Sequence, residues 1–321
     1  MRNLVYITGS GRSGSTLLDM LLSTHPDVAA LGEVHRFSIN LRNEDTPFRC
    51  TCGETLLNCK FWRAVLDKLV KDGIDPYNLL TTWSKYNNIE QNTEGTNIVE
   101  DIPPKALFSK LDLFNIFLTL GLSGIIKSTA PFIKRFHEGI NIAENSWLLY
   151  EKICEAHNLN VTVDGTKSPG RLLSLMTFNN KQIPVKVIYL CRDGRAVTHA
   201  RMNRQGLSMD YCVKAWVAEH KKISLALKHY AGQPLILKYE DLCTRTTEEM
   251  SRIFDYIQVH GDSDYSLFRE SSHSLGGNPM RLRKSENTIR LNEKWKSELS
   301  KDNLKTFELK GGRLNKRLGY N

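Results

Sequence analysis

The sequence lacks long apolar runs and has few cysteines. No segment holds 18 or more uncharged apolar residues in a row, which argues against a membrane span. The nearest candidate, residues 113–126, is too short and contains Asn115 and Thr119. Seven cysteines among 321 residues are too few for a disulfide scaffold. The first residues also lack a secretory apolar region with a small-residue cleavage site, so we expect a cytoplasmic protein if Met1 is the native start.

Acidic residues are in the minority. The chain has 44 lysines and arginines against 35 aspartates and glutamates, which gives a net charge of +9 at pH 7. Residues 281–321 hold 12 of these basic residues and only 5 acidic ones. A basic terminal segment can bind nucleic acid, an anionic membrane surface or a small polyanionic ligand. It can equally be a solvated helix with a lysine-rich face.

Four short apolar runs predict buried parallel strands, because they are rich in β-branched residues and do not alternate with polar ones. They are Leu4–Thr8, Val161–Val163, Val185–Leu190 and Leu235–Leu237. Segments with a helical apolar period are Thr16–Thr24, Phe61–Lys71, Glu144–His157, Pro169–Phe178, Gly194–Arg204, Asp210–Tyr230 and Thr247–Ile257. This alternation predicts an α/β protein with a doubly wound parallel sheet. Residues 37–141 show no clear strand, and we interpret them as a helical insertion in a single domain covering residues 1–321.

A glycine-rich loop follows the first predicted strand. It reads Gly9-Ser-Gly-Arg-Ser-Gly-Ser-Thr16 and precedes an amphipathic helix, which is the context of a phosphate-binding loop. Glycines let the backbone N–H groups turn inward, and the helix N-terminus adds partial positive charge. The lysine that grips the β- and γ-phosphates of ATP is absent, and Arg12 supplies a cation instead. We see no obvious acidic residue for Mg²⁺ at the end of the strand Val185–Leu190. The loop is therefore expected to bind an anionic group without a nucleoside triphosphate–metal complex.

The loop and the residues after it resemble a known family. The sequence GSGRSGSTLL, followed by His25-Pro26-Asp27 and by Gly32-Glu33, looks like the sulfotransferases that use 3′-phosphoadenylyl sulfate (PAPS). It is closest in style to the tyrosyl-protein sulfotransferases and their bacterial relatives. The resemblance implies a P-loop-like fold and transfer of a sulfuryl group from PAPS to a hydroxyl, with the bisphosphate PAP as product. It also implies that the loop holds the 5′-phosphosulfate through Gly11, Arg12, Ser13, Gly14, Ser15 and Thr16.

The strand end at Cys191-Arg192 resembles the 3′-phosphate signature of the family. There a strand-end arginine, matched by Arg192, and a serine eight residues later bind the 3′-phosphate. The serine position is Ala200, which departs from the family pattern, and Thr198, His199 or Arg201 could substitute. Arg204 falls where the protein-tyrosine branch has another nucleotide-binding arginine.

Two later segments agree with the same family. Leu237-Lys-Tyr239-Glu-Asp-Leu242 looks like its strand-end YEDL, whose tyrosine lies near the nucleotide. Residues 273–281, with Trp295 downstream, resemble the basic C-terminal segment that closes over PAPS. The resemblance implies that Gly277, Asn278 and Arg281 contribute to donor binding, with Arg281 neutralising the 3′-phosphate and adenosine side.

Sulfuryl transfer to a hydroxyl needs a base, positive charge on the transferred group and a stabilised leaving group. Glu33 is the best candidate base, because it follows the apolar segment Val28–Leu31 and matches the GE pair of the family. His35 is the alternative base, since cytosolic members of the family use histidine. Lys167 resembles the lysine that lies on the bridging oxygen of the leaving group. Arg12 is expected to contact both sulfate and 5′-phosphate, because a guanidinium suits paired oxyanions.

Three cysteines lie close together in the expected insertion. Cys50, Cys52 and Cys59 could ligate zinc with one more donor, or two of them could form a disulfide. The usual zinc pattern of two paired dyads is missing, so we favour a structural role without a metal.

The most specific hypothesis is a PAPS-dependent sulfotransferase that needs no metal and has no nucleic-acid partner. The acceptor stays open: a carbohydrate, a peptide tyrosine, a lipid or a small molecule are all compatible, and residues 37–141 are expected to shape its cleft. A second hypothesis is a non-catalytic binder of nucleotide bisphosphates, which the change at Ala200 slightly favours. A third, a small-molecule kinase, is disfavoured by the missing loop lysine.

Overall fold

A five-stranded, wholly parallel sheet forms the centre of the molecule. The computed structural model describes residues 1–43, 49–83, 112–261, 263–282 and 288–321. The strands are β1 (Asn3–Gly9), β2 (Val28–Ala30), β3 (Val161–Lys167), β4 (Val185–Cys191) and β5 (Leu235–Lys238). Their order is β2-β3-β1-β4-β5, and all neighbouring pairs are parallel. The predicted α/β class and doubly wound parallel sheet are confirmed.

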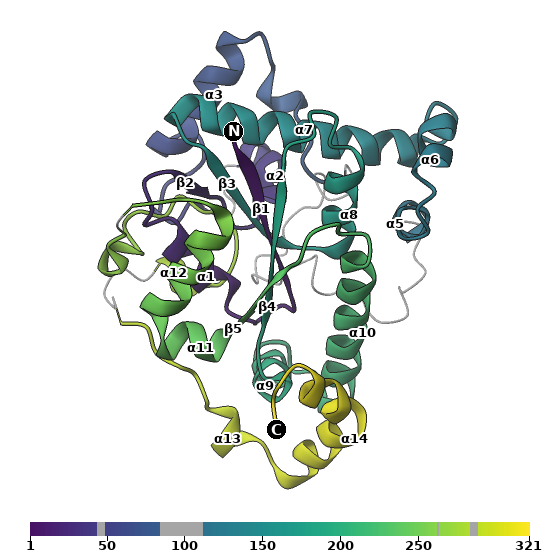
Figure 1. Ribbon diagram of the computed structural model, residues 1–321, viewed down its shortest axis with the longest axis vertical. Helices are drawn as coiled ribbons and strands as arrows, with labels where there is room; N and C mark the ends of the chain where they lie inside the picture. The colour runs from purple at the N-terminus through teal and green to yellow at the C-terminus, as the bar shows by residue number, and fades with distance from the viewer. Residues whose placement is uncertain (44–48, 84–111, 262, 283–287) are drawn as a thin grey trace.

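Helices cover both faces of this sheet, as Figure 1 shows. The side chains of β1 alternate between two cores, because successive residues of a strand point to opposite faces. Val5 and Ile7 pack in the core with α1 (Ser15–Leu22) and α12 (Thr246–Ile257). Leu4 and Tyr6 pack in the other core with α7 (Lys134–His157) and α8 (Pro169–Thr177). The central strand is therefore buried on both sides, as its apolar sequence predicts.

The described parts of residues 37–141 contain helices and no strand. They hold α2 (Phe37–Arg42), α3 (Lys60–Lys71), α5 (Asp112–Thr119), α6 (Ser123–Thr129) and the 3₁₀ turn η2 (Pro76–Asn78). One predicted boundary differs, because α7 begins at Lys134 and not at Glu144. Phe136 and Ala143 extend its apolar face against α5 and α6, so the helix continues unbroken from the insertion into the core.

The C-terminal third completes the carboxyl edge of the sheet. It contains α9 (Gly194–Gln205), α10 (Met209–Leu227), α11 (Tyr239–Thr244), η4 (Tyr265–Leu267), η5 (Pro279–Leu282), α13 (Trp295–Glu298) and α14 (Lys301–Arg317). The last helix packs Phe307 against Trp216 of α10. Its basic side chains are exposed at positions 301, 305, 310, 313, 316 and 317. These residues correspond to the solvated lysine-rich face that the charge pattern allowed.

None of the helices in the described residues combines the length and the apolar character needed to cross a bilayer.

Candidate functional site

The glycine-rich loop lies at the carboxyl end of β1 and leads directly into α1. Gly14 caps this helix with φ of 96°, a conformation that favours glycine. A Cβ atom at Gly14 would lie 2.3 Å from Cδ2 of Tyr239, so this glycine is also needed for close packing. Its carbonyl accepts hydrogen bonds from the N–H groups of Leu17 and Leu18. The helix N-terminus therefore opens at Ser15 and Thr16, where the sequence predicts the phosphosulfate.

One polar group of the loop is buried with no role in the fold itself. Ser13 is 1% exposed, and among the described residues its hydroxyl has no hydrogen-bond partner. An unsatisfied buried hydroxyl costs free energy, so such atoms in native proteins commonly serve a ligand. The hydroxyl of Ser13, next to a helix N-terminus, is suited to an anionic oxygen.

Arg192 joins the loop to the end of β4. Its Nη1 donates to the carbonyl of Arg12 at 2.9 Å, and its Nη2 donates to the carbonyl of Asn292 at 2.9 Å. Its guanidinium carbon lies 4.2 Å from the centre of the Tyr239 ring. Its Nε is buried and has no partner among the described residues. Arg192 thus keeps its Nε donor for a ligand while the ring and two carbonyls hold the guanidinium in place.

The structure distinguishes the three residues that could replace the missing serine at position 200. Thr198 donates its hydroxyl to the carbonyl of Gly194 within α9, and His199 lies 3.0 Å from a carboxylate oxygen of Glu298. Only Arg201 of these three has a hydrogen bond to the loop, from its Nη2 to Ser10 Oγ at 3.0 Å, and it also pairs with Glu219. Arg204 is exposed one turn later, on nearly the same face of α9.

Glu33 and Lys167 meet at the neighbouring strand ends. β2 pairs with β3 through Val28–Ala30 and Val161–Val163, which brings the residues after both strands to one edge. Lys167 Nζ lies 2.8 Å from Glu33 Oε1, and Arg36 Nε lies 2.8 Å from Glu33 Oε2. Each carboxylate oxygen of Glu33 therefore has its own cation. The candidate base and the candidate leaving-group lysine, 134 residues apart in sequence, form one ion pair.

These contacts set the protonation of the site. Burial alone would raise the pKa of Glu33, but the charges of Lys167 and then Arg36 hold it well below its usual range. Burial, followed by the charge of Arg36, lowers the pKa of His35 to about 3, so this imidazole is neutral at pH 7. Burial raises the pKa of Asp19 on α1 to about 6, although hydrogen bonds from Ser274 and the Gly32 amide oppose that rise.

A C-terminal strap, residues 273–278, crosses the edge formed by these side chains. The Leu275 N–H donates to the Leu31 carbonyl at 2.9 Å, and the Leu275 carbonyl accepts from the Glu33 N–H at 2.7 Å. The Asn278 N–H donates to Thr16 Oγ1 at 3.0 Å, and a Cβ at Gly277 would lie 2.8 Å from the same oxygen. Gly277 and Asn278 thus lie over the start of α1.

Arg281 is buried among the charged residues of the cleft. It is 3% exposed, its Nη1 donates to the Arg49 carbonyl at 2.6 Å, and its charged neighbours include Glu33 and Asp19. Burial lowers the pKa of this guanidinium. Arg281 therefore lies near Glu33 and Asp19, and its part in binding the 3′-phosphate stays a prediction.

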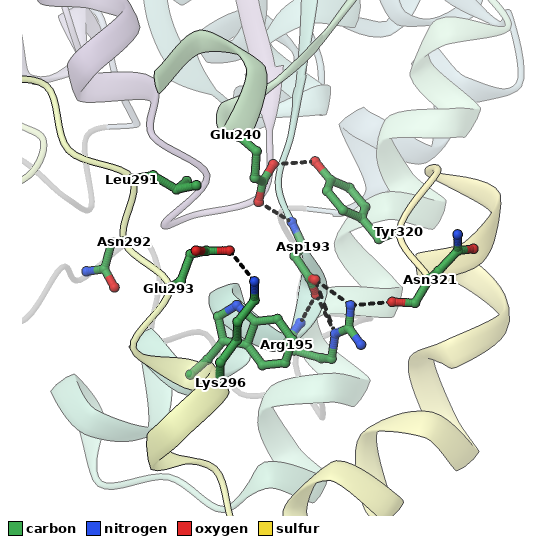
Figure 2. Close-up of a pocket in the computed structure, with 10 residues that line it drawn as sticks. Asp193, Arg195, Glu240, Leu291, Asn292, Glu293, Lys296, Tyr320 and Asn321 are labelled. Carbon is green, nitrogen blue, oxygen red and sulfur yellow. Dashed lines mark hydrogen bonds and ion pairs between the residues drawn. The ribbon is translucent and has the colours of Figure 1, made fainter. Parts of the chain in front are cut away.

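Two hollows lie along this edge. The cleft between the loop and the strap is lined by Ser15, Thr16, Asp19, Gly32, Glu33, Gly165, Lys167, Ser274, Gly276 and Gly277. It holds about 10 Å³, which is room for roughly one water molecule. A larger pocket of about 410 Å³ lies at the ends of β4 and β5, beyond Arg192 (Figure 2).

The charges of the larger pocket do not suit a phosphate. Asp193, Glu240 and Glu293 contribute three carboxylates to its lining, against the two cations Arg195 and Lys296. Arg195 is already paired with Asp193 at 2.6 Å. The lining of the smaller cleft also holds one more carboxylate than cations, Asp19 and Glu33 against Lys167, but it includes the N-terminus of α1 at Ser15 and Thr16. This helix end makes the smaller cleft the better candidate for an anion, although the larger pocket has the greater volume.

Comparisons with known proteins address the fold. No family model matches the sequence, and no curated protein matches it. One solved structure, the sulfotransferase domain from the Synechococcus PCC 7002 olefin synthase, has a TM-score of 0.52 and 16% identity. The alignment covers 100% of this chain and 97% of that one. This chain has the fold of a sulfotransferase domain. The sulfotransferase domain from the curacin biosynthetic pathway is also similar, with a TM-score of 0.49, 17% identity and coverage of 100% of this chain and 99% of that one.

Several residues of the cleft were not found from the sequence. Arg36 holds the second oxygen of Glu33, and Asp19 bridges the Gly32 amide and the Ser274 hydroxyl. The sequence did contain an indication for Arg36, because a basic residue three positions after the proposed base can form an ion pair with it. Asp19 had another, a carboxylate on the otherwise apolar helix that follows the loop, where a charge is rarely buried without a purpose.

Proposed function

We propose that this chain transfers a sulfuryl group from PAPS to a hydroxyl group of an acceptor. The observation that carries the proposal is the position of the Glu33–Lys167 ion pair beside Thr16, at the mouth of a phosphate-type loop. A base, a cation for the leaving group and an anion-binding helix end therefore share one cleft. The sulfotransferase-domain fold supports the same reading.

In this proposal the donor's phosphosulfate lies on the loop. The N–H groups at the start of α1, the Ser13 hydroxyl and Arg12 face its oxygens. Arg192 and Arg204 hold the 3′-phosphate end, with Tyr239 packed between Arg192 and Gly14, and Gly277 and Asn278 cover the donor. The cleft has room for only about one water molecule, so the strap must move outward to admit a sulfuryl group.

The reaction forms one sulfur–oxygen bond and breaks another. The acceptor oxygen attacks sulfur and its proton passes to the Glu33 carboxylate. The bond from sulfur to the bridging oxygen breaks, and PAP leaves with that oxygen and the electron pair. Lys167 and Arg12 offset the negative charge that develops on the leaving phosphate.

The ion pair also sets when Glu33 becomes a base. With Lys167 and Arg36 both bound, the carboxylate is a weak proton acceptor, because its pKa is held low. The bridging oxygen of a bound donor competes for Lys167. Once Lys167 turns to that oxygen, the pKa of Glu33 rises and proton uptake becomes more favourable. Donor binding would thus switch on the base.

Radioactive transfer from [³⁵S]PAPS to a panel of hydroxyl acceptors tests the proposal. The panel includes a carbohydrate, a tyrosine peptide, a lipid alcohol and a phenol. We expect Glu33→Gln and Lys167→Met each to lose at least about 100-fold in rate. Glu151→Gln, which breaks the exposed pair with Lys181, is the matched control and should leave the rate unchanged. Unchanged rates in both cleft variants would refute their assigned roles.

Calorimetry with PAP separates the alternatives. Tight PAP binding without transfer to any acceptor would favour the non-catalytic bisphosphate binder, and the change at Ala200 is the feature that supports it. Absence of heat with both PAPS and PAP would refute donor binding altogether. Magnesium-dependent ATP hydrolysis would favour a kinase, for which the loop lacks its lysine.

A further inference from the structure

Four potential metal ligands come together outside the proposed transfer site. Cys50, Cys52, Cys59 and His273 each offer one ligand atom, and all four atoms lie within 4.8 Å of one another. The three cysteines belong to the insertion, whereas His273 begins the strap, 214 residues after Cys59. The sequence shows three thiols close together, which could bind zinc only with one more donor, and by itself it favours a structural role without a metal. The tertiary structure supplies the fourth donor.

We propose that these four side chains bind one Zn²⁺ ion that fastens the strap to the insertion.

The distances suit a tetrahedral site. Zn–S bonds of about 2.3 Å and Zn–N bonds of about 2.0 Å place the ligand atoms about 3.5–3.8 Å apart. Cys50 Sγ and Cys59 Sγ are 3.5 Å apart. His273 Nδ1 lies 3.5 Å from the sulfur of Cys50 and 3.3 Å from that of Cys59. Three thiolates and one imidazole form a soft, closed ligand set, which is typical of structural zinc and leaves no open position for catalysis.

The backbone holds the thiols ready for a metal. Cys50 and Gly53 form a tight turn, in which the Gly53 N–H donates to the Cys50 carbonyl at 2.8 Å and φ of Gly53 is 96°. Cys59 is the N-cap residue of α3, so its sulfur faces the positive end of a 12-residue helix. Cys50 is fully buried and Cys59 is 1% exposed. A thiolate in either place is costly to bury unless a cation neutralises it.

The imidazole of His273 is also oriented in advance. Its ring stacks on Phe61 with a centroid distance of 5.1 Å and an angle of 6° between the planes. Trp62 Nε1 donates to the His273 carbonyl at 2.8 Å. Both aromatic residues belong to α3, the helix that Cys59 caps. The same helix therefore positions the Cys59 sulfur and the two aromatic side chains that orient His273. Such outer contacts fix the ring of a metal-binding histidine.

The metal would act on the transfer cleft through the strap. Directly after His273, Ser274 accepts a hydrogen bond from the Thr51 N–H at 3.1 Å and donates to Asp19 of the cleft. Leu275 then pairs with Glu33. Zinc therefore lies one and two residues from contacts that shape the cleft. This consequence rests on the proposed function, whereas the metal site itself does not.

A disulfide is the competing explanation for the close thiols, and metal analysis distinguishes the two. The full chain, purified without added chelator, should contain about one zinc per molecule by elemental analysis. Cys59→Ser and His273→Ala should reduce that content at least about tenfold. Cys154→Ala removes a buried thiol of α7 outside the cluster and should keep the metal. A Cys50–Cys59 disulfide in a peptide map would overturn the proposal. So would a folded chain, purified without chelator, that contains no metal and has three alkylatable thiols.

A measurement on the unaltered chain covers the case in which the variants do not fold. Chelator-treated protein should take up Co²⁺ with the visible absorption bands of tetrahedral thiolate ligation, and Zn²⁺ should displace it. Cys50, Cys52 and Cys59 should resist alkylation only when metal is bound. Absence of these bands would refute the site. The same metal-free protein should bind PAP more weakly than the zinc form. If neither form binds PAP, the proposed transfer fails while the metal result stands.

Discussion

Replacing Lys167 by methionine removes one of the two cations that hold Glu33. Two unit charges 4 Å apart attract by about 4 kcal/mol at an effective dielectric constant of 20. Part of the lost attraction is offset, because the variant no longer incurs the cost of desolvating the Lys167 ammonium and Arg36 still neutralises the Glu33 carboxylate. We expect the free energy of unfolding at pH 7 to fall by about 2 kcal/mol, and the pKa of Glu33 to rise because it has lost one of its two cations.

The sign of the pH dependence follows from the low pKa of Glu33. A carboxyl group with a depressed pKa in the folded state contributes stability that is fully present above its unfolded pKa of about 4.3. That stability is lost as the pH falls toward the folded-state pKa. The variant has a smaller pKa shift, so it loses less. Both proteins share the same unfolded-state pKa, so the difference in their stability should stay constant down to the folded-state pKa of Glu33 in the variant and should shrink only below it.

Urea denaturation followed by circular dichroism between about pH 3.5 and 7 measures this difference. Methionine keeps an unbranched side chain at a position whose φ is 71°, so the backbone strain is nearly the same in both proteins. Lys181→Met breaks an ion pair whose lysine is 69% exposed, and it should cost less than about 1 kcal/mol. If Lys167→Met is as stable as the unaltered chain at pH 7, or if the difference has already vanished at about pH 4, the ion-pair reasoning is wrong.

Three further changes test the site. Gly14→Ala should destabilise the chain by about 2–4 kcal/mol in denaturant unfolding, because the new methyl would overlap Tyr239. Gly206→Ala, with φ of 65° and open space, should cost only about 1 kcal/mol, and equal costs would contradict the packing argument. Arg192→Lys should weaken PAP binding at least about tenfold in calorimetry, since an ammonium cannot keep both carbonyl bonds and the ring contact; unchanged affinity would remove this residue from the donor site. A pKa raised to about 6 makes the unaltered protein lose stability as the pH rises from about 4 to 7, whereas Asp19→Asn has no such loss. The free energy of unfolding of the variant, relative to that of the unaltered chain, should therefore increase by up to about 3 kcal/mol over this range. A parallel pH profile for the two proteins would contradict this last result.

Local patterns in the sequence predicted the sheet well. Strand β1 extends one residue beyond each end of the predicted run, and β3 continues to Lys167 where the prediction stopped at Val163. The extension has a tertiary cause, because Lys167 pairs with Thr8 of β1 after a register shift. An apolar run marks the buried part of a strand but not the polar residues that continue its pairing.

The site was predictable in parts and not as an assembly. The glycines of the loop follow from the turn that they must make, and Glu33 follows from the strand before it. The contact between Glu33 and Lys167 depends on β2 pairing with β3 across the whole insertion. The position of Arg281 beside Glu33 depends on the strap, whose path no local pattern encodes.

The sequence by itself determined the strands, the helix that follows the loop and the residue types at the strand ends. Each of these depends on neighbours within a few positions, through apolar periodicity or through the backbone freedom of glycine. Only the tertiary structure decided which distant side chains contact one another. These are the ion pair of Glu33 with Lys167, the hydrogen bond of Arg201 to Ser10, and the cluster of His273 with three cysteines. Those contacts depend on the order of the strands and on the path of the chain across their ends, which are properties of the whole packed molecule.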